Sequence, residues 1–215
     1  MERIIPIQKL TFGKYFNEYE KYGGCAEGLI EMPLPEYFKL NRKKYPIPKS
    51  LDEFSDAICY GQRIFMGQKE DEDFSIILRQ IDGYYYSIVT GEEWDDKKAL
   101  IFGKKVLTCR VIELYPIAMH LLSLVLEMAE RERKMLHREP TTMEKLAGID
   151  ELNIFSELAA LDFLRSSMNK TVEQVMLTPY NECLVRFLMA KRTIDYQERL
   201  FDRQKAEQMI KYKNQ

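Results

Sequence analysis

The sequence predicts a mainly helical protein of the α+β class, with a helical C-terminal half, a long terminal helix and a small sheet or hairpin in the N-terminal half. Three observations support this class. Helical periodicity with clear start and stop signals runs from residue 150 to residue 215. Segments of β-branched and aromatic composition are short and few. Prolines interrupt residues 25–50, which we expect to be irregular.

The terminal helix is the most clearly marked element of the chain. Thr178 and Pro179 are suited to open it, because a Thr hydroxyl can accept a bond from a first-turn amide and Pro has no amide to leave unpaired. Residues 180–190 carry apolar side chains almost all round, which predicts burial on every side. From Lys191 onward the apolar residues thin to a narrow stripe among charged residues.

A helix of about 36 residues is roughly 50 Å long, whereas a compact globule of this size is about 45 Å across. Two arrangements fit this length: the end of the helix leaves the body, or residues 191–212 fold back along the chain. For the first arrangement we predict partner contacts through the apolar anchors of a helix that binds in a groove, Ile194, Phe201, Met209 and Tyr212. Truncation after Arg192 is then expected to remove association and to leave the fold intact.

Local signals place the other helices. Capping boxes occur at residues 50–53, 141–144 and 171–174. A helix over 153–168 is expected to end at Asn169 in the left-handed conformation. Further helices are expected at 11–22, 50–65 and 74–81, and from Pro116 to about His137. Strands are expected at 84–89 and 105–114, with a short one at 4–7. We divide the chain into a mixed region, 1–114, and a helical region, 115–215, which together can form one continuous domain.

Composition and charge exclude several classes of protein. The formal net charge is −2, so the overall charge does not indicate nucleic acid or a membrane as partner. The longest apolar run, residues 116–126, is shorter than the roughly 20 residues that span a bilayer, and the first residues do not resemble a signal peptide. The four cysteines lack metal-ligand spacing. These features indicate a reduced, cytoplasmic chain with no membrane contact.

Two segments favour nucleic acid: residues 37–45, and the basic end of the chain from Lys205 to Lys213, within a terminal helix that has 8 Lys/Arg against 5 Asp/Glu. Lys39, Arg42, Lys43 and Lys44 lie between aromatic residues at 37, 38 and 45, and such segments can follow a phosphate backbone and stack on bases. The same composition is typical of a solvated loop with its aromatic rings turned inward. A nucleic-acid-associated accessory protein is therefore the alternative function.

The sequence contains no recognisable catalytic motif. Neither a glycine-rich phosphate loop nor a nucleophile elbow occurs. Of the two histidines, His120 lies in an apolar segment, and Cys109 or Cys183 could pair with it only through the fold. Residues 70–73 are acidic but lack the pattern of a calcium loop. We therefore predict a protein that is not an enzyme and that binds no cofactor or metal.

The C-terminal half resembles the tail assembly chaperones and related tail or baseplate assembly factors of tailed bacteriophages. The resemblance lies in the order of its segments: a helix with a charged end at 130–136, an Ala-Gly-Ile turn at 147–149, a helix at 155–164, a cap at 170–175 and a helix with tyrosines from Pro179. It implies a non-enzymatic role in phage assembly or in the virion, with other tail or virion proteins or further copies of the chain as partners. It implies the host cytoplasm or the virion as location. The pattern defines no functional residue.

Overall fold

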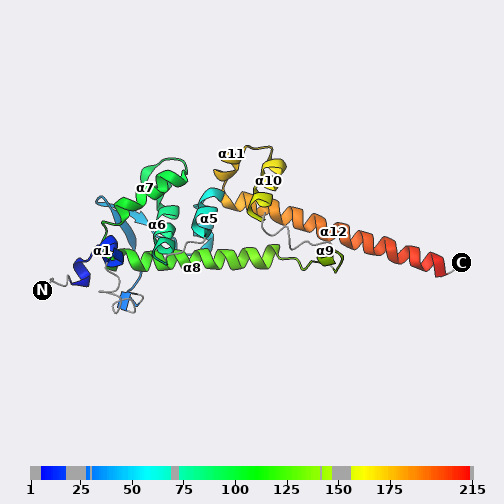
Figure 1. The fold of residues 1–215 in the computed structure, drawn as a ribbon, viewed down its shortest axis with the longest axis horizontal. Helices are drawn as coiled ribbons and strands as arrows, with labels where there is room; N and C mark the ends of the chain where they lie inside the picture. The colour runs from blue at the N-terminus through cyan, green and yellow to red at the C-terminus, as the bar shows by residue number, and fades with distance from the viewer. Residues whose placement is uncertain are drawn as a thin grey trace.

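A computed structural model describes residues 6–17, 28–29, 31–68, 73–140, 142–146 and 156–213. The molecule is elongated: the N-terminal elements form a rounded body at one end, and the terminal helix extends far beyond it at the other (Figure 1). The mainly helical class with a small sheet is confirmed. In order, the elements are η1 Ile7–Lys9, α1 Phe12–Asn17, β1 Tyr37–Leu40, β2 Lys43–Pro46, α4 Leu51–Asp56, α5 Tyr60–Gly67, α6 Asp73–Thr90, α7 Asp96–Val106, α8 Val111–Leu136, α9 Thr142–Leu146, α10 Ser156–Met168, α11 Val172–Met176 and α12 Tyr180–Lys213.

The sheet of the described residues lies where the sequence predicted irregular chain. Strands β1 and β2 form an antiparallel hairpin, joined by Asn41 and Arg42. Both joining residues have positive φ, 51° and 66°, and this is the conformation whose twist suits a two-residue hairpin turn. Phe38 and Leu40 alternate inward and are buried. The expectation of an irregular segment at 37–46 was therefore wrong.

Helix α6 replaces the strand predicted at 84–89. The helix expected at 74–81 runs on to Thr90, through the Asp82-Gly83 pair that was expected to form a turn. Tyr84, Tyr85 and Tyr86 are all buried although they are consecutive. A helix packed on several sides can bury consecutive residues, and α6 contacts α5, α7 and α8. The aromatic and β-branched residues of this segment favour a strand, but packing against the neighbouring helices makes the segment helical.

The strand predicted at 105–114 was also wrong. Residues 105–106 end α7, and residues 111–114 form the first turn of α8, which begins five residues before Pro116. The end of α8 at Leu136 agrees with the prediction. The boundary drawn between residues 114 and 115 falls inside α8, and the main hydrophobic core contains residues from both sides of it. The division into two regions stays a prediction.

Long-range backbone pairing fixes where α5, α8 and α12 begin. The Tyr60 amide donates to the Thr178 carbonyl over 2.9 Å, and the Tyr180 amide donates to the Ile58 carbonyl over 3.0 Å. The Val111 amide makes the equivalent bond to Leu10 over 2.9 Å. The first pairing requires extended chain before Tyr60, so the helix predicted over 50–65 is divided into α4 and α5.

The predicted helix ends were partly confirmed. Ser50 accepts from the Glu53 amide over 3.2 Å, the capping box at 171–174 forms in both directions, and Asn169 has a φ of 53°. The amide of Tyr180, the first residue of α12, donates to the Ile58 carbonyl over 3.0 Å and not to Thr178, whose hydroxyl donates to the Gln174 carbonyl over 2.8 Å. The strand predicted at 4–7 was wrong at Ile7, which begins η1. Four other predicted features lie outside the described residues: the cap at Thr141, the stop at Gly148, the start of the helix at 153–155 and residues 4–5 of that strand. So do residues 18–22 of the first predicted helix.

Helix α8 is the centre of the core. It contacts η1, α1, β1, α4, α5, α6 and α12, and most of its first half is buried. By length and composition alone, α8 is the one described helix apolar enough to cross a membrane. Its burial against so many elements is that of a core helix. A smaller apolar cluster joins α10, α11 and the start of α12 around Leu164, Val175 and Cys183.

Candidate interaction helix

The second half of α12 leaves the body of the protein. Its first turns pack inward through Tyr180, Cys183 and Leu184, which are at most 5% exposed. Every described residue from 199 to 210 is exposed, and Figure 1 shows the helix passing beyond the ends of α8 and α9. Residues 199–213 project by about 22 Å. The alternative in which 191–212 fold back along the chain is therefore wrong beyond residue 198.

The expected burial of residues 180–190 on every side was also wrong. Val185 and Met189 are 52% and 57% exposed. They lie on the side of α12 that faces away from α8 and α10, and no described element covers them. The composition of this segment predicted burial because its inward side and its outward side are both apolar.

Lys191 fastens α12 to the end of α8. Its ammonium group donates to the carbonyl oxygens of Met135 and His137, over 3.0 and 2.8 Å. The last carbonyls of a helix have no partner within the helix and carry the negative end of its dipole. Lys191 therefore supplies to α8 a cap that the local sequence lacks, and it thereby fixes the position of α12.

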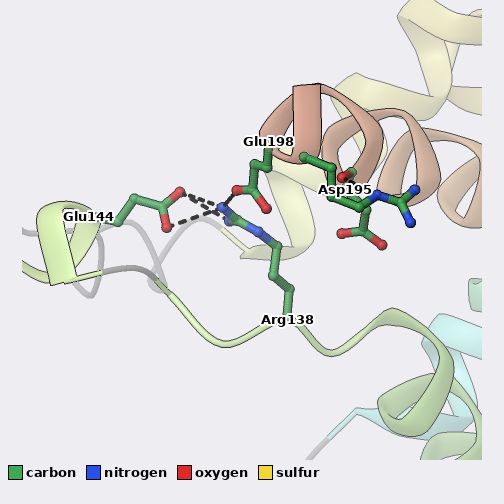
Figure 2. Close-up of polar contacts among 5 residues, drawn as sticks. Arg138, Glu144, Asp195 and Glu198 are labelled. Atoms are coloured by element: carbon green, nitrogen blue, oxygen red, sulfur yellow. Dashed lines mark hydrogen bonds and ion pairs between the residues drawn. The ribbon is translucent and has the colours of Figure 1, made fainter. Parts of the chain in front are cut away.

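A second contact follows two turns later. The guanidinium group of Arg138 lies between Glu144 of α9 and Glu198 of α12 and forms ion pairs with both (Figure 2). The three side chains are 26%, 33% and 42% exposed. Because one arginine is held by two carboxylates, three segments of the chain are joined at this point. We call Lys191, Arg138, Glu144 and Glu198 the root clamp of α12.

The structure places three of the four predicted contact residues on α12 with large exposed fractions. Ile194, Phe201 and Met209 are 44%, 64% and 58% exposed. Their spacing of seven and eight residues puts them on one side of the helix. Tyr212 lies on α12, but its side chain is outside the described residues. Contact with a partner stays a prediction for all four.

A second apolar stripe on α12 was missed by the sequence reasoning. Tyr196, Leu200 and Ile210 are 59%, 42% and 60% exposed. At 100° per residue they share a side with Met189, and they lie roughly 100–180° around the helix from Phe201. The spacing of four, three, four and three residues over positions 196, 200, 203, 207 and 210 is that of a coiled-coil seam. This signal is present in the sequence, but it emerges only when the apolar residues from 191 onward are divided between two sides of the helix.

A cavity of about 390 Å³ lies beside the root of α12, between α5, α8 and α10. Its wall carries an ion pair, in which Arg63 Nε and Nη2 donate to Glu132 Oε1 and Oε2 over 2.9 and 2.6 Å. Tyr60 also lines it, and burial raises the pKa of Tyr60 to about 12. This part of the wall therefore presents a paired arginine and glutamate and a phenol that stays protonated at neutral pH.

The hairpin at 37–45 presents basic side chains to solvent but few aromatic rings that could stack on bases. Lys39, Arg42, Lys43 and Lys44 are exposed. Phe38 is 1% exposed, and its ring lies 4.4 Å from that of Tyr85. Tyr37 is exposed, with Lys44 over its ring. The hairpin therefore offers one outward aromatic ring, Tyr37, instead of the series that single-strand binders use.

The residues considered for catalysis have other contacts. His120 Nε2 lies 2.7 Å from the Pro48 carbonyl, and Cys109 Sγ lies 3.9 Å from the Lys39 carbonyl. Cys183 is fully buried in the smaller cluster. Burial raises the pKa of both thiols to about 11, which leaves them protonated and weakly nucleophilic at neutral pH. No metal-binding group of His, Cys, Asp or Glu occurs among the described residues.

Comparison with known proteins gives no relative: no family model, no curated protein and no solved structure matches this chain.

Proposed function

We propose that this chain is a non-enzymatic protein-interaction component that presents the projecting part of α12, residues 199–213, to other proteins. The observation that carries the proposal is the exposure of every described residue from 199 to 210. Four of them, Leu200, Phe201, Met209 and Ile210, are large and apolar. Exposed apolar residues in such density mark binding surfaces.

The root clamp supports this role. A helix that projects without support would pay the entropy of ordering when it binds. Here Lys191 and Arg138 hold the last contacted turns in place, and the projecting turns continue a helix that is already formed. The binding segment is therefore partly preorganised, and its apolar residues can act as anchors in a groove of the partner.

The biological setting that we propose is the assembly or structure of a tailed phage, as a tail or baseplate assembly factor or a virion component. It is supported by the resemblance of segment order in the C-terminal half. The expected partners are other tail or virion proteins, in the host cytoplasm or in the particle. The aromatic residues of the hairpin point mainly inward, so the nucleic-acid alternative gains no support from its geometry.

The test is capture of partners by the tagged full-length chain from nuclease-treated native lysate, read by mass spectrometry. The variant Leu200→Glu with Phe201→Glu charges the projecting segment. Its matched control is Leu100→Glu with Ile101→Glu, an adjacent pair on α7 that is 54% and 60% exposed. We expect the wild type and the α7 control to retain the same tail or virion protein, and the α12 variant to lose it.

Equal capture by all three proteins would show that the partner binds elsewhere. Capture of replication or transcription proteins, or loss of every partner upon nuclease treatment, would favour the nucleic-acid alternative. Binding through phosphates would then weaken steeply with added salt.

A further inference from the structure

We infer that one occupant of the projecting helix is a second copy of this chain, bound antiparallel through the seam formed by Tyr196, Leu200, Arg203, Glu207 and Ile210. This inference rests on the proposed function, because it concerns the same part of α12, and it names the partner and the geometry. The evidence is the arrangement of apolar and charged residues along the seam.

The seam has the geometry of a two-stranded coiled coil. Its positions alternate at spacings of four and three residues, which keeps them on one side of a helix. All five are exposed, so nothing in the described structure occupies this side. Lys205 lies on the opposite side of α12, and it is exposed there.

The seam is complementary to itself when the second helix runs in the opposite direction. A two-fold axis beside residue 205 places Leu200 of one copy opposite Ile210 of the other. The same axis places Arg203 opposite Glu207. Each contact occurs twice by symmetry, as an isologous interface requires. The dimer thus contains two apolar pairs flanking two ion pairs.

The charge of the helix favours the antiparallel direction. From 195 to 202 the chain carries one arginine and three carboxylates, of which Glu198 is already paired with Arg138. From 203 to 213 it carries four basic residues and one glutamate. Parallel pairing would bring the two basic ends together and would place Arg203 against Arg203. Antiparallel pairing places the basic end of each helix beside the acidic part of the other, which lowers the electrostatic energy.

The size of the seam predicts a weak dimer. Residues 200–210 span about 16 Å of helix, and two such surfaces bury less than the roughly 1,200 Å² of a standard stable interface. Dimerisation is therefore expected to depend on concentration over the micromolar range. A partner that buries more of α12 can displace the second copy.

The first experiment is sedimentation equilibrium of the full-length chain from 1 to 300 µM. The weight-average mass is expected to rise from 25.5 kDa towards twice that value. Arg203→Glu alone places glutamate opposite Glu207, and Glu207→Arg alone places arginine opposite Arg203. Each single variant is expected to weaken self-association at least tenfold. Lys205→Glu, on the opposite side of the same helix, is the matched control and is expected to dimerise like the wild type.

The decisive sample is an equimolar mixture of the two single variants. In a mixed dimer, the glutamate at position 203 faces the arginine at position 207, and Glu207 of the first variant faces Arg203 of the second. The mixture is therefore expected to dimerise more strongly than either single variant does alone. In a parallel dimer like charges already face each other in the wild type, so the single variants would not weaken association.

A wild type that stays monomeric at 300 µM overturns the inference. It is also overturned if the wild type dimerises but both single variants dimerise with the same affinity. Either result leaves the proposed function intact if the charged variant at 200 and 201 still loses its captured partner. Conversely, a dimer with the expected charge dependence supports the inference even when no other protein is captured.

Discussion

The ion pair between Arg63 of α5 and Glu132 of α8 predicts a substantial loss of stability when its charge is removed. Both side chains are mostly buried, with exposed fractions of 18% and 21%, and two charge-assisted bonds join them. Glu132→Gln keeps the shape of the side chain but turns one of its acceptors into a donor that faces the guanidinium. Such bonds contribute about 1.5–3 kcal/mol each. Since partial exposure reduces this value, we expect a loss of about 2 kcal/mol.

Equilibrium urea unfolding followed by the fluorescence of Trp94 measures this change. Trp94 is the single tryptophan, and its ring packs 5.1 Å from that of Phe65 on α5. A loss of about 2 kcal/mol corresponds to a fall in Tm of roughly 4–8 °C for a chain of this length. Glu130→Gln, which affects exposed ion pairs on the same helix, is the control and is expected to leave the midpoint unchanged.

A loss below about 0.5 kcal/mol for Glu132→Gln would refute this reasoning, because the pair would then behave like an exposed one. A second variant separates charge from packing. Arg63→Met with Glu132→Leu replaces the pair by apolar side chains, and Leu136 and Phe187 line the same cavity. Replacing both partners of a buried pair is often neutral. The double variant is therefore expected to be more stable than Glu132→Gln.

Three further predictions concern the body of the protein. Burial raises the pKa of Asp82 well above 3.8, with part of the rise offset by Arg79. The folded state then keeps a proton that the unfolded chain releases, so the free energy of unfolding should fall as pH rises above 3.8. Asp82→Asn should reduce this pH dependence, as measured by urea titrations at several pH values. Arg42→Gly should raise the stability by about 0.5–1 kcal/mol, because Arg42 holds a φ of 66°, and an unchanged Tm would contradict this. Gly61→Ala should cost about 1–3 kcal/mol, since its Cβ would meet Trp94 at 2.7 Å and a backbone carbonyl at 2.9 Å; wild-type stability would show that Trp94 can move aside.

Features encoded in a few neighbouring residues could be predicted from the sequence. The caps at Ser50 and Thr171 and the left-handed Asn169 each depend on a side chain and a backbone group within four positions. The end of α8 at Leu136 also follows from a local change of composition. Local signals of this kind do not depend on what surrounds the helix.

Features that depend on distant partners could not be predicted. Tyr84, Tyr85 and Tyr86 have strand composition, and they are helical because α5, α7 and α8 surround them. The break before Tyr60 exists because its amide pairs with Thr178, more than one hundred residues away. No local pattern carries that information.

The candidate site was predicted in part. Length and composition left two arrangements open, a projecting helix with apolar anchors or a helix folded back along the chain. The helix projects, and Ile194, Phe201 and Met209 are exposed on α12. The contacts that hold the helix, from Lys191 and Arg138, join segments that no local pattern places together. Leu200 and Ile210 were among the apolar residues noted in this helix. That they share a side separate from the predicted anchors becomes clear only when each residue is placed around the helix.

The root clamp also determines when this surface can appear during synthesis. Its contacts join residues 54, 56 and 60 positions apart, and α12 is translated after α5, α8 and α9. Domains fold largely in the order in which their segments leave the ribosome. The clamp can close only once α8 has formed its last turn. The projecting part of α12 is therefore held in its final position only after α8 and α9 have folded.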